Sequence, residues 1–186
     1  MSIKITKRAF DKMLGEVCWE IFHENINLSL KFGRPKLFIY ENKKNPTLDR
    51  KLRCLTGIKF EWLFWVTNGY WKLTVLDNSG KKKLVATSSS PRSKKDDTIR
   101  YFWGQKLDRV EIDSKLFQTR LFFDLGAELV VRRPRDITKE VWILYEPNGY
   151  CLSLFGNGKY LHMPAKSTDR RPPAEKIIDG DIVVVR

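Results

Sequence analysis

The chain has 186 residues, of which 42% are hydrophobic, so it can fill the core of one large domain or two small ones. Its 35 Lys and Arg outnumber its 22 Asp and Glu and give a formal charge of +13. This charge excludes an acidic nucleic-acid mimic and argues against a positively charged partner. No run approaches the roughly 20 apolar residues that span a membrane, so we expect no membrane partner.

The three cysteines lie far apart, at positions 18, 54 and 151, and form no Cys-x-x-Cys pair. A disulfide scaffold or a zinc knuckle normally requires closely spaced cysteines. The N-terminus carries basic residues but neither the apolar run nor the cleavage site of a secretory signal. These features predict a protein of the reducing cytoplasm.

An apolar stripe near the N-terminus predicts one helix. Its members recur at spacings of three and four: Phe10, Met13, Leu14, Val17, Cys18, Ile21 and Phe22. This is the period of an amphipathic helix, here from about residue 7 to 25. Because its polar face carries as many acids as bases, we expect this helix to pack on a sheet rather than on a membrane surface.

From Leu28 onward the hydrophobic period changes to two, which is typical of strands. Ile58 to Val66 reads as one strand and Trp71 to Val75 as its partner, joined by Asn68-Gly69. An Asn-Gly dipeptide between two such runs is a strong signal of a β-hairpin.

Further strands follow in the C-terminal half, joined by turns at Asp124-Leu125-Gly126, Asn148-Gly149 and Asn157-Gly158. The predicted strands are residues 110–115, 116–123, 128–132, 141–145, 151–155, 159–163 and 181–185. Connections this short join antiparallel neighbours.

The predicted fold class is α+β, mainly antiparallel β. Hairpins build a sandwich or an open barrel, and the N-terminal amphipathic helix packs on a sheet. Residues 1–186 are expected to form a single β-rich domain. The polar segment 88–97, which contains Pro91, is expected to be a mobile loop and a soft joint between two β modules.

Basic residues gather at the predicted turns and strand ends. Those expected to contact a polyanion are Lys81, Lys82, Lys83, Arg92, Lys94, Lys95, Arg132, Arg133 and Arg135. If folding brings these turns together, they offer a phosphate backbone one electropositive surface. Lysines at strand ends also prevent edge-to-edge aggregation, so solubility and edge protection are the alternative explanation.

The chain is also rich in aromatic residues, with 6 Trp, 6 Tyr and 11 Phe. Aromatic rings beside basic residues can stack on single-stranded bases. Because consecutive residues of a strand alternate faces, at least half of the rings are expected in the core. The others can form an exposed patch for a protein partner or a homodimer.

The sequence offers little catalytic chemistry. Its 2 His accompany no Ser or Cys nucleophile motif, and no Gly-rich phosphate loop or His-Glu-x-x-His motif occurs, so no cofactor and no metal are expected. Glu111, Asp113 and Lys115 share one predicted strand, and Asp97 lies upstream. This spacing resembles the (D/E)xK element of the restriction-endonuclease-like nucleases. The resemblance implies that the acids hold Mg²⁺ and that Lys115 assists the attacking water. The alternative is a strand edge with paired charges.

The leading hypothesis is therefore a non-enzymatic binding protein whose basic loops contact an anionic partner, with nucleic acid as the first choice. A protein-interaction module or homodimer built on exposed aromatics is the alternative. A Mg²⁺-dependent nuclease is the third reading. The leading hypothesis requires that the basic clusters share one surface.

Overall fold

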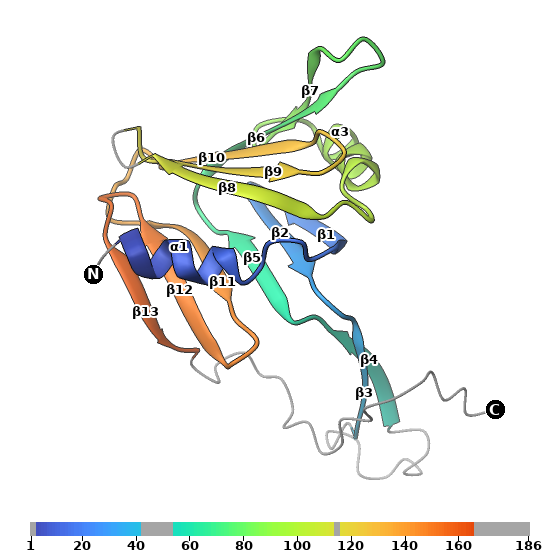
Figure 1. Cartoon of the computed structure of the whole chain (residues 1–186), viewed down its shortest axis with the longest axis vertical. Helices are drawn as coiled ribbons and strands as arrows, with labels where there is room; N and C mark the ends of the chain where they lie inside the picture. Colours follow the sequence, from blue (N-terminus) through green and yellow to red (C-terminus); the bar gives the residue numbers. More distant parts are fainter. Residues whose placement is uncertain (1–2, 42–53, 114–115, 166–186) are drawn as a thin grey trace, which may run out of the picture. The chain divides into compact units, whose positions relative to one another are not determined.

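The computed structural model describes residues 3–41, 54–113 and 116–165 (Figure 1). The chain divides into two compact units, residues 1–33 with 61–165 and residues 34–60 with 166–186. The expected joint at residues 88–97 lies inside the first unit. Among the described helices, none is long and apolar enough to cross a membrane.

The first unit contains two sheets, a six-stranded one in the order β1-β2-β5-β11-β12-β13 and a five-stranded one in the order β7-β6-β10-β9-β8. Their strands are β1 (Cys18–Glu24), β2 (Asn27–Phe32), β5 (Trp62–Val66), β6 (Tyr70–Leu76), β7 (Lys82–Thr87), β8 (Leu107–Asp113), β9 (Gln118–Phe123), β10 (Glu128–Arg132), β11 (Glu140–Tyr145), β12 (Tyr150–Phe155) and β13 (Tyr160–Pro164). In the second unit, β3 (Lys36–Glu41) pairs with β4 (Cys54–Lys59). All of these pairs are antiparallel, as predicted, and neither large sheet closes into a barrel.

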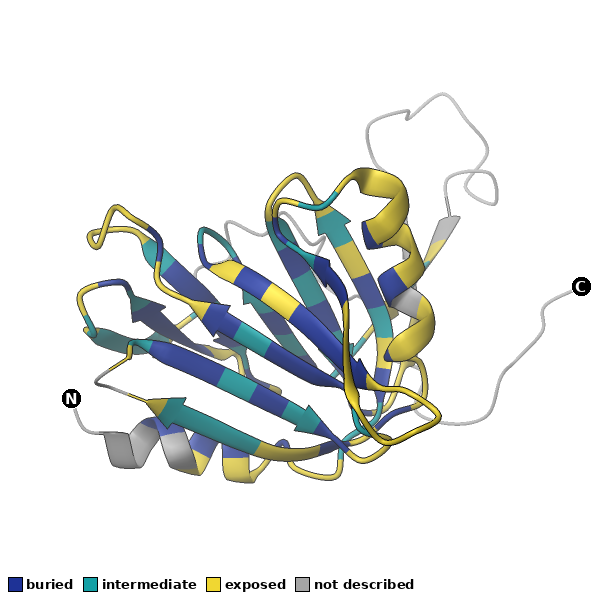
Figure 2. Cartoon of the chain, turned by 90° about the horizontal axis from the view of Figure 1, so that it is seen from above, coloured by how far each residue is buried: buried dark blue, intermediate teal, exposed yellow. Residues whose placement is uncertain are grey.

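The two large sheets pack around one hydrophobic core, to which alternate residues of their strands contribute (Figure 2). Phe32 of β2 stacks on Phe123 of β9, with ring centroids 6.2 Å apart. The indole of Trp142 in β11 donates a 2.9 Å hydrogen bond to the hydroxyl of Thr119 in β9. The two sheets thus face each other across one shared core.

The N-terminal helix is much shorter than predicted. Helix α1 spans Ile3–Asp11, whereas residues 18–24, also expected to be helical, form β1. Between them, Gly15 adopts a left-handed φ of 82°, and its N–H donates to the Leu107 carbonyl at 2.7 Å. A left-handed glycine ends a helix because the helical hydrogen bonds cannot continue through it.

Helix α1 nevertheless packs on the six-stranded sheet. The Phe10 ring lies 6.1 Å from that of Phe64 and 5.6 Å from that of Trp142, measured between centroids. Ala9 and Met13 join the same core. The short helix therefore covers part of the core-facing side of this sheet.

Two predicted strand connections are wrong. The run from Ile58 to Val66 is interrupted, because β4 ends at Lys59 and β5 begins at Trp62 in another sheet. Asn68-Gly69 joins β5 to β6, which belong to different sheets and form no hairpin. A Cβ on Gly69 would lie 2.8 Å from Val131 Cγ1 and 2.9 Å from Val141 Cγ1. This glycine thus permits close packing where the chain passes between the sheets.

Other turns form where they were predicted. Asn148-Gly149 and Asn157-Gly158 close the hairpins β11–β12 and β12–β13, with glycine φ values of 80° and 81°. Asp124-Leu125-Gly126 connects β9 to β10. The segment 88–97, expected to be a loop, contains α3 (Arg92–Asp96) and runs into the 3-10 helix η1 (Asp97–Tyr101). The predicted strand 181–185 lies outside the described residues.

Candidate nucleic-acid interface

Two of the predicted basic clusters fall at opposite ends of the five-stranded sheet, and the third lies in α3. Lys82 pairs with Leu76 at one end of β6, whereas Arg132 of β10 pairs with Tyr70 at the other. From Tyr70 to Leu76 the strand advances by about 20 Å, at roughly 3.4 Å per residue. The lysines of the β6–β7 hairpin and the arginines after β10 therefore lie apart.

At the β6–β7 hairpin, carboxylates accompany the lysines. The Lys82 ammonium forms an ion pair with the Glu128 carboxylate. In the turn, Asp77 Oδ1 accepts hydrogen bonds from the Ser79 hydroxyl at 2.6 Å and from the Lys81 backbone N–H at 3.0 Å. These bonds, chiefly the one from Ser79, lower the pKa of Asp77. Because β7 is an edge strand, this arrangement fits protection of the sheet edge.

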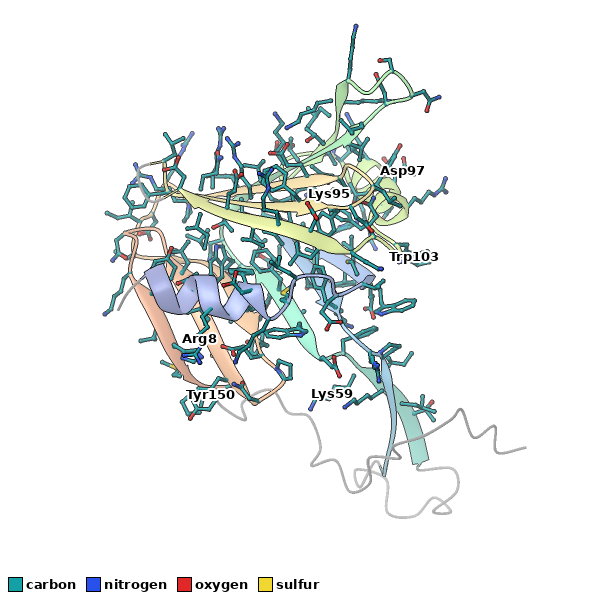
Figure 3. The ribbon with its side chains drawn as sticks, viewed as in Figure 1. Arg8, Lys59, Lys95, Asp97, Trp103 and Tyr150 are labelled. Carbon is teal, nitrogen blue, oxygen red and sulfur yellow. The ribbon has the colours of Figure 1, made fainter. Side chains whose placement is uncertain are left out.

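Lys95 is not available to a polyanion, contrary to the prediction. Its residue is only 6% exposed, and its ammonium donates a 2.5 Å hydrogen bond to the Asn25 carbonyl. The same ammonium lies 5.8 Å from the centre of the Trp71 ring. Figure 3 marks the position of Lys95 in α3. Arg92 and Lys94, the other predicted contacts in α3, are exposed.

A set of cations does converge on the five-stranded sheet near the residue where β10 ends, Arg132, on the surface turned away from the core. In one cross-strand row, Val130 of β10 lies between Lys72 of β6 and Arg120 of β9. Arg132, two residues further along β10, lies on the same side and opposite Tyr70. We call Tyr70, Lys72, Arg120 and Arg132 the basic face. Figure 2 shows the strands of this sheet side by side, with α3 at their edge rather than across them.

Neighbouring side chains hold two arginines at the margin of the basic face. Arg132 Nε donates to Gln118 Oε1 at 3.1 Å. The guanidinium of Arg133, just after β10, lies over the Phe117 ring at 4.4 Å from its centroid. A guanidinium has five N–H donors, so these contacts orient it and leave donors for a ligand. Arg135 follows as an exposed residue.

The nearby carboxylates pair with other cations. Glu111 lies opposite Arg120 in the register but forms its ion pair with Arg109, at 3.0 Å. Glu128 pairs with Lys82. Within the part of the chain that the structure describes, Lys72, Arg120 and Arg132 form no ion pair. Their charges therefore remain to attract an anion.

The nuclease-like residues lie only partly within the described chain. Glu111 and Asp113 stand on β8, and Lys115 lies outside the described residues. Asp113 Oδ1 accepts a 2.9 Å hydrogen bond from the Leu116 N–H. Asp97 begins η1, beside α3 (Figure 3). Residues 3–41, 54–113 and 116–165 contain no group of three His, Cys, Asp or Glu side chains that could hold a metal ion.

Lys72 and Arg120 are the members of the candidate site that sequence reasoning missed. Each stands alone in the middle of a strand, so neither belongs to a charged run. The signal that could have found Lys72 is the period-two alternation of the strand. Lys72 lies between the apolar residues Trp71 and Leu73, so its side chain is expected on the opposite, outward face. Charged residues at such positions line one outward sheet surface.

The chemistry of the basic face is that of anion binding. Guanidinium and ammonium groups donate to phosphate oxygens, and a tyrosine ring beside them can stack on a base. Comparison of the chain with protein-family models, curated proteins and solved structures gives no match. What the chain binds is therefore inferred from the chemistry of its own surface.

Proposed function

We propose that the chain binds nucleic acid through the basic face. The observation that carries this proposal is the convergence of Lys72, Arg120 and Arg132 on one sheet surface, with no ion-pair partner in the described chain. Tyr70, 46% exposed, lies beside Arg132 in the register. Three cations and one ring thus lie within the width of three adjacent strands.

Single-stranded nucleic acid suits this surface better than a duplex does. The cations can contact successive phosphates of an oligonucleotide that lies across the sheet, while the Tyr70 ring stacks on one of its bases. In a duplex the bases remain stacked on each other, so only the phosphate contacts are available. We therefore expect single-stranded RNA or DNA to bind more tightly than duplex.

The test is a fluorescence-anisotropy titration of a labelled single-stranded oligonucleotide with the full chain at low salt. The combined variant Lys72→Glu, Arg120→Glu and Arg132→Glu should weaken binding by at least about 100-fold, because three phosphate contacts become repulsions. The matched control reverses three exposed lysines elsewhere, Lys81, Lys83 and Lys94. It has the same net charge and should weaken binding by less than about fivefold.

Two results would overturn the proposal. Equal losses in the two triple variants would mean that net charge governs binding, without a specific face. Failure of the unmodified chain to bind single strands or duplex even at low salt would remove nucleic acid as the ligand. Near-UV circular dichroism of both variants checks that the substitutions leave the fold intact.

A further inference from the structure

Strands β8 and β9 carry a second aromatic position on the outer surface of the five-stranded sheet. Phe122 of β9 follows Arg120 by two residues, so it faces the same side of the sheet as the basic face. Arg109 of β8 lies opposite Phe122 in the register, and its guanidinium lies over the Phe122 ring, 4.2 Å from the ring centroid. We call Arg109 and Phe122 the stacked pair.

A carboxylate holds the guanidinium of the stacked pair in place. Glu111, two residues along β8, brings its Oε1 to 3.0 Å from Nη1 of Arg109. The Arg109 side chain is nevertheless 59% exposed, while Phe122 below it is partly buried. The surface that the stacked pair offers to a ligand is therefore mainly that of a guanidinium. Bases stack on guanidinium planes as they do on aromatic rings.

The stacked pair and Tyr70 lie at two ends of a diagonal across the sheet. Phe122 is two strands across from Tyr70 and four residues further along, which corresponds to about 17 Å between their backbones. Lys72, Arg120 and Arg132 lie beside this diagonal. An oligonucleotide of about six residues covers such a distance even when its bases remain stacked, at about 3.4 Å per residue.

The carboxylates beside this diagonal are compensated by cations. Glu128, opposite Phe122 in β10, forms an ion pair with Lys82, and its side chain is only 9% exposed. Glu111 forms its ion pair with Arg109. Neither carboxylate therefore opposes the phosphates of a strand that follows the diagonal.

We propose that the stacked pair is a second base-stacking position of the nucleic-acid site. One strand then stacks one base on Tyr70 and another on Arg109, while its phosphates pass the cations of the basic face. This inference rests on the proposed nucleic-acid binding and adds that the ligand is recognised through two of its bases. In the alternative role, Arg109 only covers the apolar Phe122 ring with its side chain, and bases contribute nothing at this position.

The test compares two ligands that have equal numbers of phosphates, a single strand of about six adenosine nucleotides and an abasic oligomer of the same length. Fluorescence anisotropy at low salt measures the affinity of the full chain for each. A stacked base contributes about tenfold in affinity, so two positions should give a preference of about 100-fold for the adenosine strand.

Arg109→Lys keeps the charge of the stacked pair but removes its flat guanidinium. It should lower the preference for the adenosine strand by about tenfold and change the affinity for the abasic oligomer by less than about twofold. Tyr70→Leu should lower the preference by a similar factor. The matched control Arg92→Lys makes the same substitution at an exposed residue of α3 and should leave the preference unchanged.

The failure of this inference is distinguishable from the failure of nucleic-acid binding. Equal affinities for the two ligands would overturn the inference and leave phosphate binding at the basic face standing. A preference that Arg109→Lys does not reduce, or that Arg92→Lys reduces equally, would place the second base elsewhere and overturn the inference too. Absence of binding to either ligand would overturn the proposed function, and this inference with it.

Discussion

In α3, the Lys95 ammonium donates a hydrogen bond to the Asn25 carbonyl and lies over the Trp71 ring instead of facing water. A buried hydrogen bond to a charged group contributes about 1.5–3 kcal/mol, so Lys95→Ala should lower the free energy of unfolding by about that amount. Lys94→Ala, at the exposed neighbour, should change it by less than about 0.5 kcal/mol. Urea unfolding measures both. Equal values for the two variants would show that Lys95 does not stabilise the fold.

His23 makes a second connection beside Lys95. Its Nε2 lies 2.8 Å from Asp96 Oδ1, while its own side chain is 7% exposed. Together these contacts join α3 to β1 and to the β1–β2 turn at two consecutive residues. The segment 88–97, with its Ser, Pro and Lys residues, reads as a loop in the sequence because such tertiary contacts leave no local pattern.

Among the elements, helix α1 is short but contributes a buried aromatic ring to the core. Phe10 is 2% exposed and its ring contacts those of Phe64 and Trp142. Phe10→Ala should therefore lower the free energy of unfolding by about 3–5 kcal/mol, through lost burial and the cavity left behind. Leu14→Ala, at a residue 40% exposed, should cost far less. If urea unfolding gives similar losses for both, α1 is not docked on the core.

The sequence predicted an N-terminal helix but not where it ends. Phe10 and Met13 enter the core from the α1 segment, and Cys18 and Ile21 enter it from β1. Together with Leu14, Val17 and Phe22, these residues recur at spacings of three and four, which is the pattern of a single amphipathic helix. The turn over residues 12–17, with Gly15 in the left-handed conformation, separates the two elements, and the spacing does not reveal it.

The strands after residue 118 were predicted better because their turns are local. Asn148-Gly149 and Asn157-Gly158 place glycine where a positive φ is needed, and sequence neighbours pair directly. Asn68-Gly69 carries the same letters, yet the strands on its two sides, β5 and β6, lie in different sheets. Which sheet a strand joins depends on long-range packing, and a dipeptide does not encode that.

The candidate site was predicted in part for a similar reason. Arg132 and Arg133 were visible as a charged run, and Arg132 does lie on the basic face. Lys72 and Arg120 come together with it only through the β6-β10-β9 strand order. Lys82, in an equally conspicuous run, lies at the far end of β6 and pairs with Glu128. Charge runs thus indicated only Arg132 among the cations of the basic face, and the strand order brings Lys72 and Arg120 beside it.

On the scale of the first unit, the two sheets share one core, and the surfaces that they turn away from it differ in character. The five-stranded sheet presents Lys72, Arg120 and Arg132, whereas Leu63, Trp65 and Ile143, on the outer side of the six-stranded sheet, carry no charge. The proposed nucleic acid would therefore lie on the five-stranded sheet, and its affinity should fall as salt rises.

The salt dependence of binding tests whether phosphate contacts hold the nucleic acid on the basic face. If three phosphate contacts form, affinity for a single-stranded oligonucleotide should fall by about 10²-fold for a tenfold rise in salt, because binding releases counterions from the nucleic acid. Fluorescence anisotropy over a range of salt concentrations measures this slope, and the triple variant of Lys72, Arg120 and Arg132 should lose most of it. Binding that does not change with salt would count against the basic face.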